Sequence, residues 1–574
     1  MDIVSSPDAI LDALDPEQRE VATALRGPVV VLAGAGTGKT RAITHRIAYG
    51  VRSGVYNPTS VLAVTFTARA AGEMRSRLRA LGTSGVAART FHAAALAQLR
   101  YFWPKVIGGA PGELTPQKAS LVTVAAQRIG LDVDRLAVRD LSSEIEWAKV
   151  CLVPPDNYEN RALSQGRAAP AGFTHQQVAR LATAYEEAKS ERGALDFEDV
   201  LMILAGILHE HRPVAEQVRR QYRHFVVDEY QDVSPLQQFL LDQWLGDRDE
   251  LCVVGDPAQT IYSFTGATPA YLLDFQQRFP NASQMRLTRN YRSTPQVVHL
   301  ANDVLRRGKV AGVLDLTAQR PTGPTATFTV YDDDEAEAAG VAAKAARLIA
   351  GGLKASEIAV LYRTQGQSEA FETALTQAGV GYQVRGGERF FQRKDVREAI
   401  LLLRAAAHTQ RDDMPMPAQV RDVLASLSWT DDPPTVRGAI RERWDALNAL
   451  VMLADDLAAA GLSGGNQATI STLVADLDER ALAQHAPTVE RVTLATLHAA
   501  KGLEWDAVFL VGASEGLIPI SLAETDEAVA EERRLLYVGI TRARTHLTVS
   551  YAQARASGTR ATRKRTRFLD GIGK

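Results

Sequence analysis

The sequence is poor in cysteine, has no excess of charge of either sign and contains no long apolar run. Its two cysteines, Cys151 and Cys252, are too few for a disulfide framework, a four-cysteine zinc site or a cysteine-held iron–sulfur cluster. Lysine and arginine together number 65 and aspartate and glutamate 67, for a formal net charge of -2. The chain therefore lacks an overall basic signature for nucleic acid, and any DNA-binding groove must be a local arrangement.

The first residues also lack the basic stretch and apolar core of a signal peptide. No apolar run approaches the roughly 20 residues that a helix needs to span a bilayer. We therefore expect a cytoplasmic protein without a membrane partner, which the low cysteine content fits. With 574 residues the chain is long enough for about four domains.

Short apolar runs alternate with helical patterns, which is typical of parallel α/β folds. These runs form two sets, so we expect two sheets and two α/β lobes. The first set is 28–32, 61–64, 225–227 and 251–254, and the second is 326–330, 358–361, 492–495, 507–511 and 547–550.

A helical stretch interrupts each lobe. The predicted first lobe is 1–92 and 196–286, with a helical insertion at 93–195. The predicted second lobe is 287–395 and 488–555, with a short helical insertion at 396–487. Residues 556–574 form a basic C-terminal tail, and its stretch 559–567, rich in Arg and Lys without acids, predicts a solvated segment.

A glycine-rich loop lies between the first strand and a helix expected at 41–49, which is the context of a phosphate-binding P-loop. Glycines let backbone N–H groups turn inward around a polyphosphate, and the helix N-terminus adds positive potential. Lys39 is expected to hold the β- and γ-phosphates, and Thr40 to bind Mg²⁺. The other cradle residues are Gly34, Ala35, Gly36, Thr37 and Gly38. A fortuitous glycine-rich turn is the alternative, which the strand, the Lys-Thr pair and the helix together disfavour.

Two acids end another buried strand. Asp228 is expected to bind the metal through its water shell, and Glu229 to act as the general base for the attacking water. Two solvated acids at a strand end are the alternative, which the P-loop makes less attractive. Gln259 follows a third strand and is a candidate sensor of the γ-phosphate.

Taken in order, these segments and several others resemble the motifs of the UvrD/Rep/PcrA family of superfamily-1 helicases over nearly the whole chain. The similar segments are 14–18, 65–74, 90–92, 195–199, 228–232, 255–262, 290–293, 496–504 and 531–543, together with the P-loop. The resemblance implies an α/β protein of two RecA-like P-loop lobes, each with a mainly helical insertion. It also implies ATP and Mg²⁺ as cofactors.

The resemblance assigns further nucleotide contacts. Gln18 matches the residue that reads adenine, and Tyr291 matches one that stacks on it. Glu504 matches a residue at the sugar or phosphate side of the nucleotide. Arg292 and Arg542 match arginines that reach the γ-phosphate from the second lobe, where they can stabilise transferring charge.

A single-strand DNA track needs aromatic faces for bases and polar or basic groups for phosphates. The residues that match DNA-contacting positions of the family are Thr65, Phe66, Arg69, Thr90, His92, Tyr262, Phe264 and His498. A phenylalanine after a strand is more often part of a core, and the motif match favours stacking for Phe66 and Phe264. His92 and His498 lack ligand partners at metal-site spacing, and hydrogen-bonding or core histidines are the alternative.

The resemblance implies a 3′-to-5′ single-stranded DNA translocase and helicase. It would be a monomer that acts on single strands and 3′-tailed duplexes in DNA repair, with repair proteins as candidate partners. One alternative is a translocase that displaces bound proteins but unwinds poorly alone. A P-loop small-molecule kinase and a DNA-binding module with an inactive ATPase are others; the intact Lys39, Asp228 and Glu229 disfavour the latter.

The sequence departs from the family pattern in three places. Phe264-Thr265 stands where relatives commonly have Trp-Arg, and the second insertion is shorter than in larger relatives. The likeness is closest to the second UvrD-type paralogue of actinobacteria, which carries a further C-terminal helical domain after a four-cysteine linker. That domain has no counterpart in this sequence.

Overall fold

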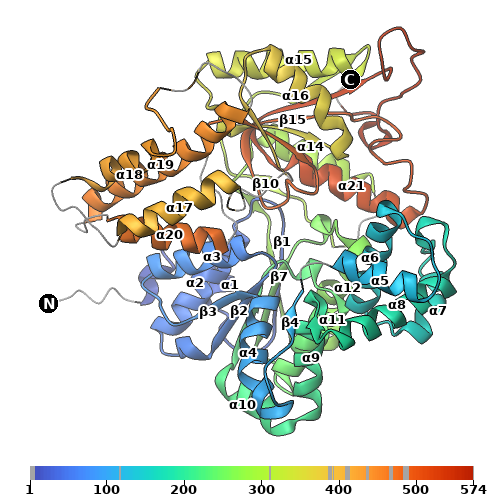
Figure 1. Cartoon of the computed structure of the whole chain (residues 1–574). Helices are drawn as coiled ribbons and strands as arrows, with labels where there is room; N and C mark the ends of the chain where they lie inside the picture. The colour runs from blue at the N-terminus through green and yellow to red at the C-terminus, as the bar shows by residue number, and fades with distance from the viewer. Residues whose placement is uncertain are drawn as a thin grey trace. The chain divides into compact units, whose positions relative to one another are not determined.

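The computed structural model describes residues 7–115, 118–308, 312–385, 391, 393–407, 414–432, 434, 439–464, 469–482 and 490–572. The chain forms two compact units, both drawn in Figure 1. Unit 1 comprises Met1–Phe66, Glu73–Thr288 and Val310–Asp315, and unit 2 comprises Thr67–Gly72, Arg289–Lys309 and Leu316–Lys574. Each unit contains one six-stranded sheet, which confirms the prediction of two α/β lobes.

The sheet of unit 1 is entirely parallel, with the strand order β3-β2-β6-β7-β1-β8. Its strands are β1 (Val29–Ala33), β2 (Val61–Thr65), β3 (Ala87–Thr90), β6 (His224–Val227), β7 (Leu251–Gly255) and β8 (Ser283–Leu287). The four inner strands are buried along their whole length because helices cover both faces. The continuous apolar runs in the sequence reflect this double burial.

Successive residues of β1 point to opposite faces of this sheet, as the pleat requires. Val29 and Val31 pack with α1 (Pro16–Thr23), α2 (Lys39–Arg52) and α3 (Ala68–Ala80). Val30 and Leu32 pack with helices of the other face. Those helices are α4 (Phe91–Val106), α9 (Phe197–Glu210), α10 (Arg212–Gln221) and α11 (Pro235–Leu245), with the short α12 (Ala270–Leu273) and α13 (Phe275–Arg278) beside them.

The parallel direction puts all carboxyl ends of the strands at one edge of the sheet. The P-loop follows β1, Asp228 follows β6 and Asp256 follows β7. Since these three strands are neighbours, the side chains that follow them are brought together without any other constraint. The opposite edge collects the turns that precede the same strands.

The first insertion has a core of its own. Its helices are α5 (Lys118–Arg128), α6 (Arg135–Val150), α7 (Tyr158–Ser164) and α8 (His175–Glu191). Leu141 and Tyr185 are among its fully buried residues. The preceding helix α4 packs instead into the core of the lobe, through Phe91, Leu99 and Phe102. The predicted start of the insertion at residue 93 was therefore too early, because the apolar face of α4 belongs to the sheet.

A buried ion cluster lies where α6 and α8 meet the start of α9. The Lys149 ammonium lies 2.6 Å from Asp196 and 2.7 Å from Asp199, and Lys189 contacts the same two carboxylates. Burial alone lowers the pKa of Lys149, but the carboxylates of Asp196, Asp199 and Glu186 outweigh it and raise that pKa. Asp196, Asp199 and Glu186 have the spacing of metal ligands, yet all three already pair with the two ammonium groups. We read the cluster as the attachment of the insertion to the lobe.

The sheet of unit 2 is also parallel, with the order β11-β16-β15-β12-β14-β13. Its strands are β11 (Thr327–Tyr331), β12 (Ile358–Tyr362), β13 (Tyr382–Val384), β14 (Val492–Thr496), β15 (Trp505–Leu510) and β16 (Ala543–Ala552). Two-stranded pairs add β9 (Arg289–Asn290) with β10 (Thr317–Ala318) in unit 2, and β4 (Glu113–Leu114) with β5 (Ala194–Leu195) in unit 1.

Helices flank this second sheet as well. One face packs on α15 (Asp334–Ala350) and α16 (Ser368–Gln377), while α14 (Pro295–Arg306) and α21 (Asp526–Ile540) contact β16 and each other. The second insertion has a separate core formed by α17 (Lys394–Ala407), α18 (Met416–Ala425), α19 (Ala439–Gly464) and α20 (Ile470–Leu482). The predicted fold of two lobes with helical insertions is thus confirmed, and the remaining domain boundaries stay predictions.

The end of the basic tail is not solvated throughout. Within the stretch 559–567 that was predicted to be solvated, residues 559–562 are exposed, but Thr566 is fully buried, as are Phe568 and Leu569 just after it. The Thr566 backbone N–H donates to the Ala513 carbonyl, and the Arg563 guanidinium pairs with Asp334. The prediction was wrong for this part because two apolar residues just after the basic run dock it onto unit 2.

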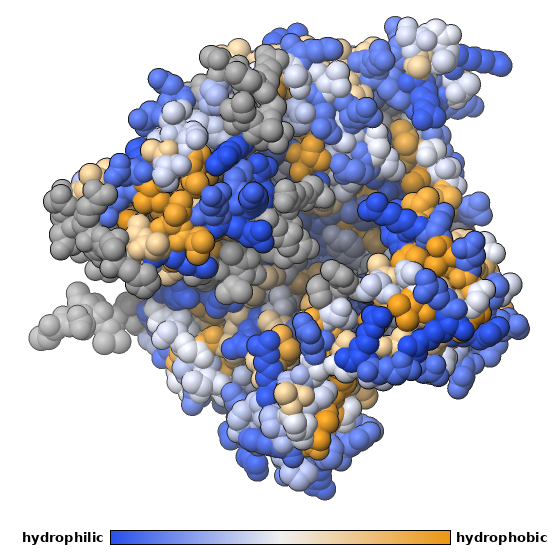
Figure 2. Space-filling model, viewed as in Figure 1, coloured by the Kyte–Doolittle hydropathy of each residue, from blue (hydrophilic) through white to orange (hydrophobic). Residues whose placement is uncertain are grey.

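The face of the molecule drawn in Figure 2 is largely hydrophilic, with apolar patches between the polar areas. Within the part of the chain that the structure describes, no helix combines the length and apolarity needed to cross a membrane.

Candidate functional site

The P-loop of unit 1 connects β1 to α2 as a tight turn. Gly36 and Gly38 have φ values of 71° and 79°, a left-handed conformation that favours glycine. The Thr37 hydroxyl donates to the Gly34 carbonyl at 2.8 Å, which closes the loop on itself. Ala33, Gly34, Ala35 and Thr37 are buried. The loop therefore has the form of a preformed cradle at the N-terminus of α2.

Lys39, at the start of α2, lies among carboxylates. Its ammonium is 3.3 Å from Glu229 Oε1. Burial alone lowers the pKa of Lys39, but the charges of Glu229, Asp256 and Asp228 outweigh it and raise that pKa. Lys39 is therefore a fixed positive charge inside the cradle, as the binding of phosphates requires.

Thr40 and Asp228 lie side by side. The Thr40 hydroxyl donates to Asp228 Oδ2 at 3.4 Å, across a sequence separation of 188 residues. Burial, followed by the charge of Glu229, raises the pKa of Asp228 to about 7. A hydroxyl and a buried, undercompensated carboxylate are oxygen donors that suit a hard divalent cation, so the predicted Mg²⁺ ligands fit the ion by their chemistry.

Gln231 connects the acids that follow β6 to the end of β7. Its Nε2 donates to Glu229 Oε2 at 2.6 Å, and its Oε1 accepts the Asp256 backbone N–H at 2.9 Å. Gln231 is fully buried, and Glu229 has a φ of 54°, a strained conformation for a residue with a Cβ. The buried amide thus fixes the carboxylate of Glu229 at a position that the backbone alone disfavours.

Gln259 lies in a short helical turn after β7 and is buried. Its Nε2 donates to Asp256 Oδ2 at 2.7 Å, and burial raises the pKa of Asp256. The predicted γ-phosphate sensor is therefore linked through Asp256 to Gln231. The sensing role itself stays a prediction.

Two residues of α1 anchor the segment that contains the predicted adenine reader. The Gln18 amide donates to the Thr37 carbonyl at 2.9 Å, so Gln18 contacts the P-loop directly. The Glu17 carboxylate accepts the backbone N–H and the hydroxyl of Thr288, just beyond β8. The structure thus places Gln18 beside the cradle, and its contact with adenine stays a prediction.

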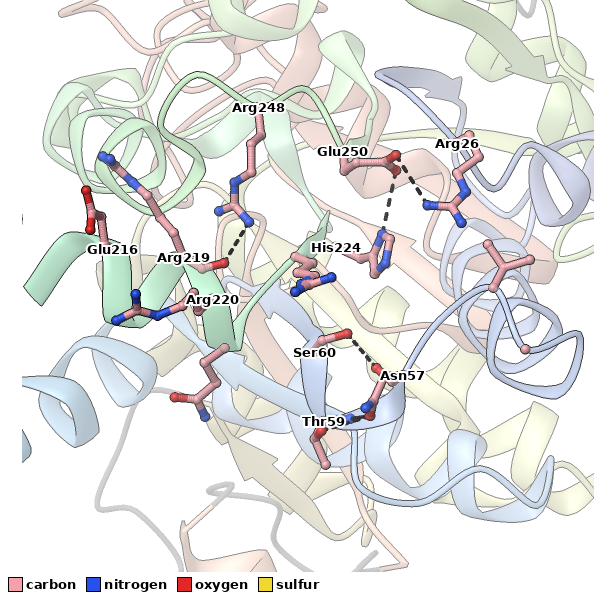
Figure 3. Close-up of a pocket in the computed structure, with 14 residues that line it drawn as sticks. Arg26, Asn57, Thr59, Ser60, Glu216, Arg219, Arg220, His224, Arg248 and Glu250 are labelled. Carbon is pink, nitrogen blue, oxygen red and sulfur yellow. Dashed lines mark hydrogen bonds and ion pairs between the residues drawn. The ribbon is translucent and has the colours of Figure 1, made fainter. Parts of the chain in front are cut away.

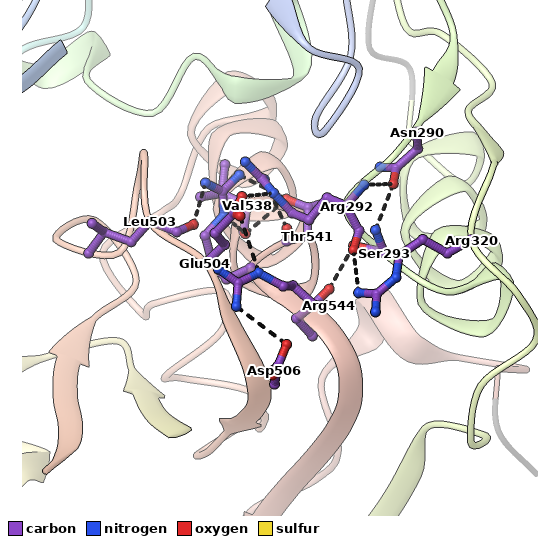
Figure 4. A network of polar contacts seen from close by, with 12 residues as sticks. Asn290, Arg292, Ser293, Arg320, Leu503, Glu504, Asp506, Val538, Thr541 and Arg544 are labelled. Carbon is purple, nitrogen blue, oxygen red and sulfur yellow. Dashed lines mark hydrogen bonds and ion pairs between the residues drawn. The ribbon is translucent and has the colours of Figure 1, made fainter. Parts of the chain in front are cut away.

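The predicted nucleotide contacts of unit 2 form one polar network, shown in Figure 4. Arg292 Nε donates to Glu504, and Arg292 Nη1 donates to the Thr541 carbonyl at 3.1 Å. Arg544 contacts Glu504 from a second direction at 3.2 Å. Burial alone raises the pKa of Glu504, but the positive charges of Arg292 and Arg544 have the larger effect and lower that pKa. Tyr291, next to this network, is 42% exposed, as a stacking face must be.

Arg542 is 1% exposed and is held by its own unit. Its guanidinium donates to the carbonyls of Val538 and Leu503 and to the Thr541 hydroxyl, at 2.9, 3.0 and 3.1 Å. These bonds join the end of α21 to the turn before β15. The predicted contact of Arg292 and Arg542 with a γ-phosphate stays a prediction.

Two comparisons with known proteins bear on this arrangement. A family model described as the UvrD/REP helicase N-terminal domain matches residues 14–280, and one described as the UvrD-like helicase C-terminal domain matches residues 285–416 and 419–554. The chain belongs to the UvrD/REP helicase family. The resemblance drawn from the sequence motifs is thereby confirmed.

Individual relatives agree with this assignment. The chain is 53% identical to the ATP-dependent DNA helicase UvrD2 of Mycobacterium tuberculosis over 591 residues, covering 100% of this chain and 83% of the relative. It is 31% identical to UvrD1 of the same organism over 676 residues, covering 99% and 86%. It is 29% identical to the ATP-dependent DNA helicase PcrA of Bacillus subtilis over 625 residues, covering 95% and 84%.

Three of the DNA contacts expected of a UvrD/REP helicase form an aromatic array in unit 1. Phe66 stacks on Tyr262 with ring centroids 6.2 Å apart and an interplanar angle of 12°, and Tyr262 contacts Phe264 at 6.2 Å. Phe66 and Phe264 are 39% and 56% exposed. Exposed aromatic rings held by a third ring are suited to base stacking.

The other residues matched to DNA contacts differ in accessibility. Thr65 is 1% exposed, and its hydroxyl has no hydrogen-bond partner among the described residues. Thr90 caps α4 by accepting the Ala93 N–H at 3.1 Å, and Arg69 is half-buried in the first turn of α3. These side chains are buried or take part in the protein's own structure, and their DNA roles stay predictions.

Both histidines of the UvrD/REP motifs are partly buried. Burial lowers the pKa of His92 and of His498 to about 4. His92 stacks on Phe197 with ring centroids 3.8 Å apart. Both imidazoles are therefore neutral at physiological pH and cannot offer a positive charge to a phosphate, which favours the alternative of packed, hydrogen-bonding histidines.

Sequence reasoning missed Gln231, Glu17 and Arg544. Gln231 lies two residues after Glu229 within a motif that was recognised, so the signal was present, but the motif alone does not show which group the amide contacts. Glu17 and Arg544 contact residues distant in the sequence, Thr288 and Glu504, and no local pattern predicts such pairs.

Proposed function

We propose that this UvrD/REP family member is a 3′-to-5′ single-stranded DNA translocase and DNA helicase driven by Mg²⁺-ATP hydrolysis. One arrangement carries the proposal: the glycine cradle, Lys39, Thr40, Asp228 and Glu229 lie at one edge of a parallel sheet in a chain of this family. The relatives named above as ATP-dependent DNA helicases support the same activity.

Within unit 1 each residue has a defined task. The backbone N–H groups of the P-loop and Lys39 hold the phosphates, and Thr40 and Asp228 hold the metal. Bound Mg²⁺-ATP supplies a phosphoryl group whose charge the metal partly neutralises. Glu229 orients the attacking water and takes its proton, while Gln231 holds its carboxylate by donating to Oε2.

Unit 2 would complete the reaction. Arg292 and Arg542 would stabilise the charge on the transferring phosphoryl group, and Tyr291 would stack on the adenine. An arginine that reaches the phosphate only when two lobes close couples hydrolysis to movement. The hydrogen bonds of Arg542 to α21 and to the turn before β15 would transmit that movement into the second sheet.

The DNA track would use Phe66, Tyr262 and Phe264 for bases. Direction of movement, a role in DNA repair, repair partners and action as a monomer belong to the proposal through the family likeness. A second candidate is a translocase that displaces proteins but unwinds poorly alone. The backbone N–H of Thr265 donates to the Tyr262 carbonyl at 3.1 Å. Relatives commonly have an arginine at this position, and its absence here favours the second candidate.

The first experiment measures ATP hydrolysis with and without single-stranded DNA, for the native chain and for Lys39→Ala. We expect strong stimulation of the native chain, loss of turnover in the variant, and DNA binding retained by both. Arg135→Ala, an exposed cation in the first insertion, serves as the matched control. Full turnover of Lys39→Ala would rule out the proposed phosphate cradle.

The second experiment compares unwinding of 3′-tailed and 5′-tailed duplexes with displacement of a protein bound on a 3′-tailed strand. Unwinding of only the 3′-tailed duplex supports the helicase proposal. Displacement without unwinding supports the second candidate. Unwinding from the 5′ tail alone contradicts the proposed direction while leaving the ATPase assignment intact.

A further inference from the structure

A large basic cavity lies at the other edge of the first sheet. Its volume is about 1140 Å³, and Figure 3 shows its walls. Four turns that lead into strands line it: Arg26 before β1, Ser60 before β2, Arg223 before β6 and Glu250 before β7. Because these strands are parallel, the cavity collects their amino ends, whereas the P-loop and Asp228 follow their carboxyl ends. Strands of four or five residues separate the two by roughly 15 Å.

The cavity is strongly positive in a chain that is not. Five arginines and two glutamates line it, which leaves a formal charge of +3, although the chain as a whole carries -2. The arginines are Arg26, Arg219, Arg220, Arg223 and Arg248. Clustering like charges is unfavourable unless an anion offsets them or each has a structural partner. Whether each arginine has a partner within the protein therefore indicates whether the cavity is suited to an anion.

Three of the five arginines have such partners. Arg248 donates four hydrogen bonds to the carbonyls of Arg219, Tyr222, Trp244 and Leu245. Arg219 donates to the Gln243 carbonyl at 3.0 Å. These two arginines hold the backbone around the cavity. Arg26 pairs with Glu250 at 3.7 Å (Figure 3).

The other two arginines have none. Arg220, at the end of α10, and Arg223, before β6, are exposed, and their guanidinium groups have no hydrogen bond or ion pair among the described residues. Glu216, the second acid of the cavity, pairs with Arg212 outside it. The guanidinium groups of Arg220 and Arg223 are thus available to a ligand, beside the backbone that Arg219 and Arg248 hold by hydrogen bonds.

The lowered pKa of the buried His224 reflects the positive charge of these arginines. Burial, followed by the charges of Arg26, Arg46, Arg223 and Arg248, lowers the pKa of His224 to about 4. Its Nδ1 lies 3.6 Å from Glu250, too far for a hydrogen bond. The nearby Glu250 carboxylate therefore does not cancel the lowering of the His224 pKa by the arginines.

The remaining lining residues indicate the chemistry of the ligand. Asn57 and Gln221 add amide groups, which with arginine are among the side chains that usually contact phosphate oxygens. The hydroxyls of Thr59 and Ser60, which also line the cavity, already donate to Asn57 (Figure 3). The only ring that lines the cavity, that of His224, is covered by Tyr56 at 4.2 Å. The cavity therefore has donors for phosphates and no free aromatic face for a base.

We propose that this cavity is a second phosphate-binding site of unit 1, separate from the P-loop, in which Arg220 and Arg223 bind phosphate oxygens. The phosphate belongs either to the backbone of a nucleic acid or to a small phosphate compound, since both present the same oxygens to a guanidinium group. The inference goes beyond the proposed motor activity, whose residues in unit 1 lie at the opposite edge of the sheet.

The test uses the full chain and the double variant R220Q/R223Q, which removes both charges and keeps hydrogen-bonding side chains of polar character. The control is R135Q/R180Q, which removes two exposed arginines of the first insertion that also have no partner among the described residues. Unchanged thermal unfolding and ATP hydrolysis establish that the variants are folded.

Three probes separate the possible ligands. Calorimetry measures inorganic diphosphate binding with the P-loop filled by Mg²⁺-ADP. Fluorescence anisotropy measures a short blunt DNA duplex over a range of salt concentrations. Polyglutamate tests carboxylates in place of phosphates. We expect R220Q/R223Q to weaken phosphate binding by about tenfold or more, because hydrogen bonds between charged groups are the strong class, with the control unchanged.

Each outcome decides the proposal. Loss of duplex affinity with a salt slope reduced by roughly 2, at about 0.9 per neutralised phosphate, identifies the nucleic-acid backbone. Loss of diphosphate affinity alone identifies a small phosphate compound. If neither phosphate probe distinguishes R220Q/R223Q from the control, the proposal is overturned. It is overturned as well if only polyglutamate does, and the cavity is then reassigned to an acidic protein segment.

Discussion

Gln231 donates a hydrogen bond to Glu229 at 2.6 Å and accepts one from the Asp256 backbone N–H at 2.9 Å. One buried amide therefore joins the proposed general base to the end of the neighbouring strand. Because both atoms of the amide are used, no other side chain of similar size can replace it without losing one bond. The geometry of Glu229 should consequently depend on Gln231.

We expect Gln231→Glu to lower kcat for ATP by about tenfold to a hundredfold, part of the 10²–10⁴ that a positioned base contributes. The new carboxylate cannot donate to Glu229 and places a second negative charge beside it. Steady-state ATP hydrolysis measures the effect, with ATP and DNA affinity expected to change little. The matched control is Gln127→Glu, the same change at an exposed position of α5. A kcat equal to that of the control would show that Gln231 does not position the base.

Arg542 should affect both stability and turnover. Removing it breaks three buried hydrogen bonds between α21 and the turn before β15, including the one to the Leu503 carbonyl, at a cost of about 1–3 kcal/mol. We expect Arg542→Ala to lower the unfolding midpoint and to reduce kcat by about 10³-fold, with a small change in KM for ATP. Arg542→Lys, which keeps a charge, should recover more stability than turnover.

Arg555→Ala, at an exposed position after β16, is the control for this pair of variants. Stability and kcat are measured on the same preparations, so that a misfolded fraction is recognised. If Arg542→Ala is less stable but hydrolyses ATP at the native rate, Arg542 is a structural residue and the proposed charge stabilisation across the lobes is incorrect.

The inner strands of both sheets could be predicted from the sequence, and so could one edge strand, β11, whereas the edge strands β3, β8 and β13 could not. β1 and β6 are buried on both faces, so their sequences are continuous apolar runs. β3 and β8 end the first sheet and are partly exposed, so polar residues such as Arg89 and Arg286 interrupt them. The apolar pattern that identifies a strand is therefore weakest at the edges.

The cradle could be predicted because its residues are close in the sequence, and the acids because they end a strand. The contacts of Gln231 with Asp256 and of Glu17 with Thr288 could not, since they depend on which strands become neighbours. The basic cavity could not be predicted from the sequence for the same reason. Its arginines come from the end of α10 and from turns before three different strands, and a net charge of -2 gives no sign of a local excess.

His224 should make the protein sensitive to acid. Burial and nearby arginines lower its pKa to about 4, against 6.5 in an unfolded chain. Between these values the unfolded chain binds a proton that the folded chain does not, so stability is lost as the pH falls through this window. The loss is at most about 1.4 kcal/mol per pH unit for one histidine. His92 and His498 act in the same direction.

We therefore expect the contribution of His224 to the free energy of unfolding to be lost as the pH falls from 7.5 to 5, read as the urea midpoint of the native chain relative to that of His224→Gln. The raised pKa of Asp228 acts in the opposite direction, but equally in both chains. His224→Gln should lose less stability over this interval than the native chain. His299→Gln, at an exposed position of α14, should behave as the native chain does. Equal losses for His224→Gln and the native chain would mean that this histidine is not kept neutral by folding.

The aromatic array offers the most direct test of the DNA track. Phe264 is 56% exposed and contacts Tyr262, which stacks on Phe66. We expect Phe264→Ala to weaken single-stranded DNA binding by about 1–3 kcal/mol, the contribution of stacking on one base. Phe66→Ala should act similarly, and the loss for both together should be less than additive, since the rings share Tyr262 as support.

Fluorescence anisotropy with a short single strand measures these affinities, and ATP hydrolysis without DNA should be unchanged because the cradle is not touched. Tyr101→Ala removes an equally exposed ring on α4, 52% exposed, and is the control. An effect of Tyr101→Ala as large as that of Phe264→Ala would indicate nonspecific loss of apolar surface. Native DNA affinity in the Phe66 and Phe264 variants would place the track elsewhere on the protein, since stacking is the contribution these exposed rings are positioned to make.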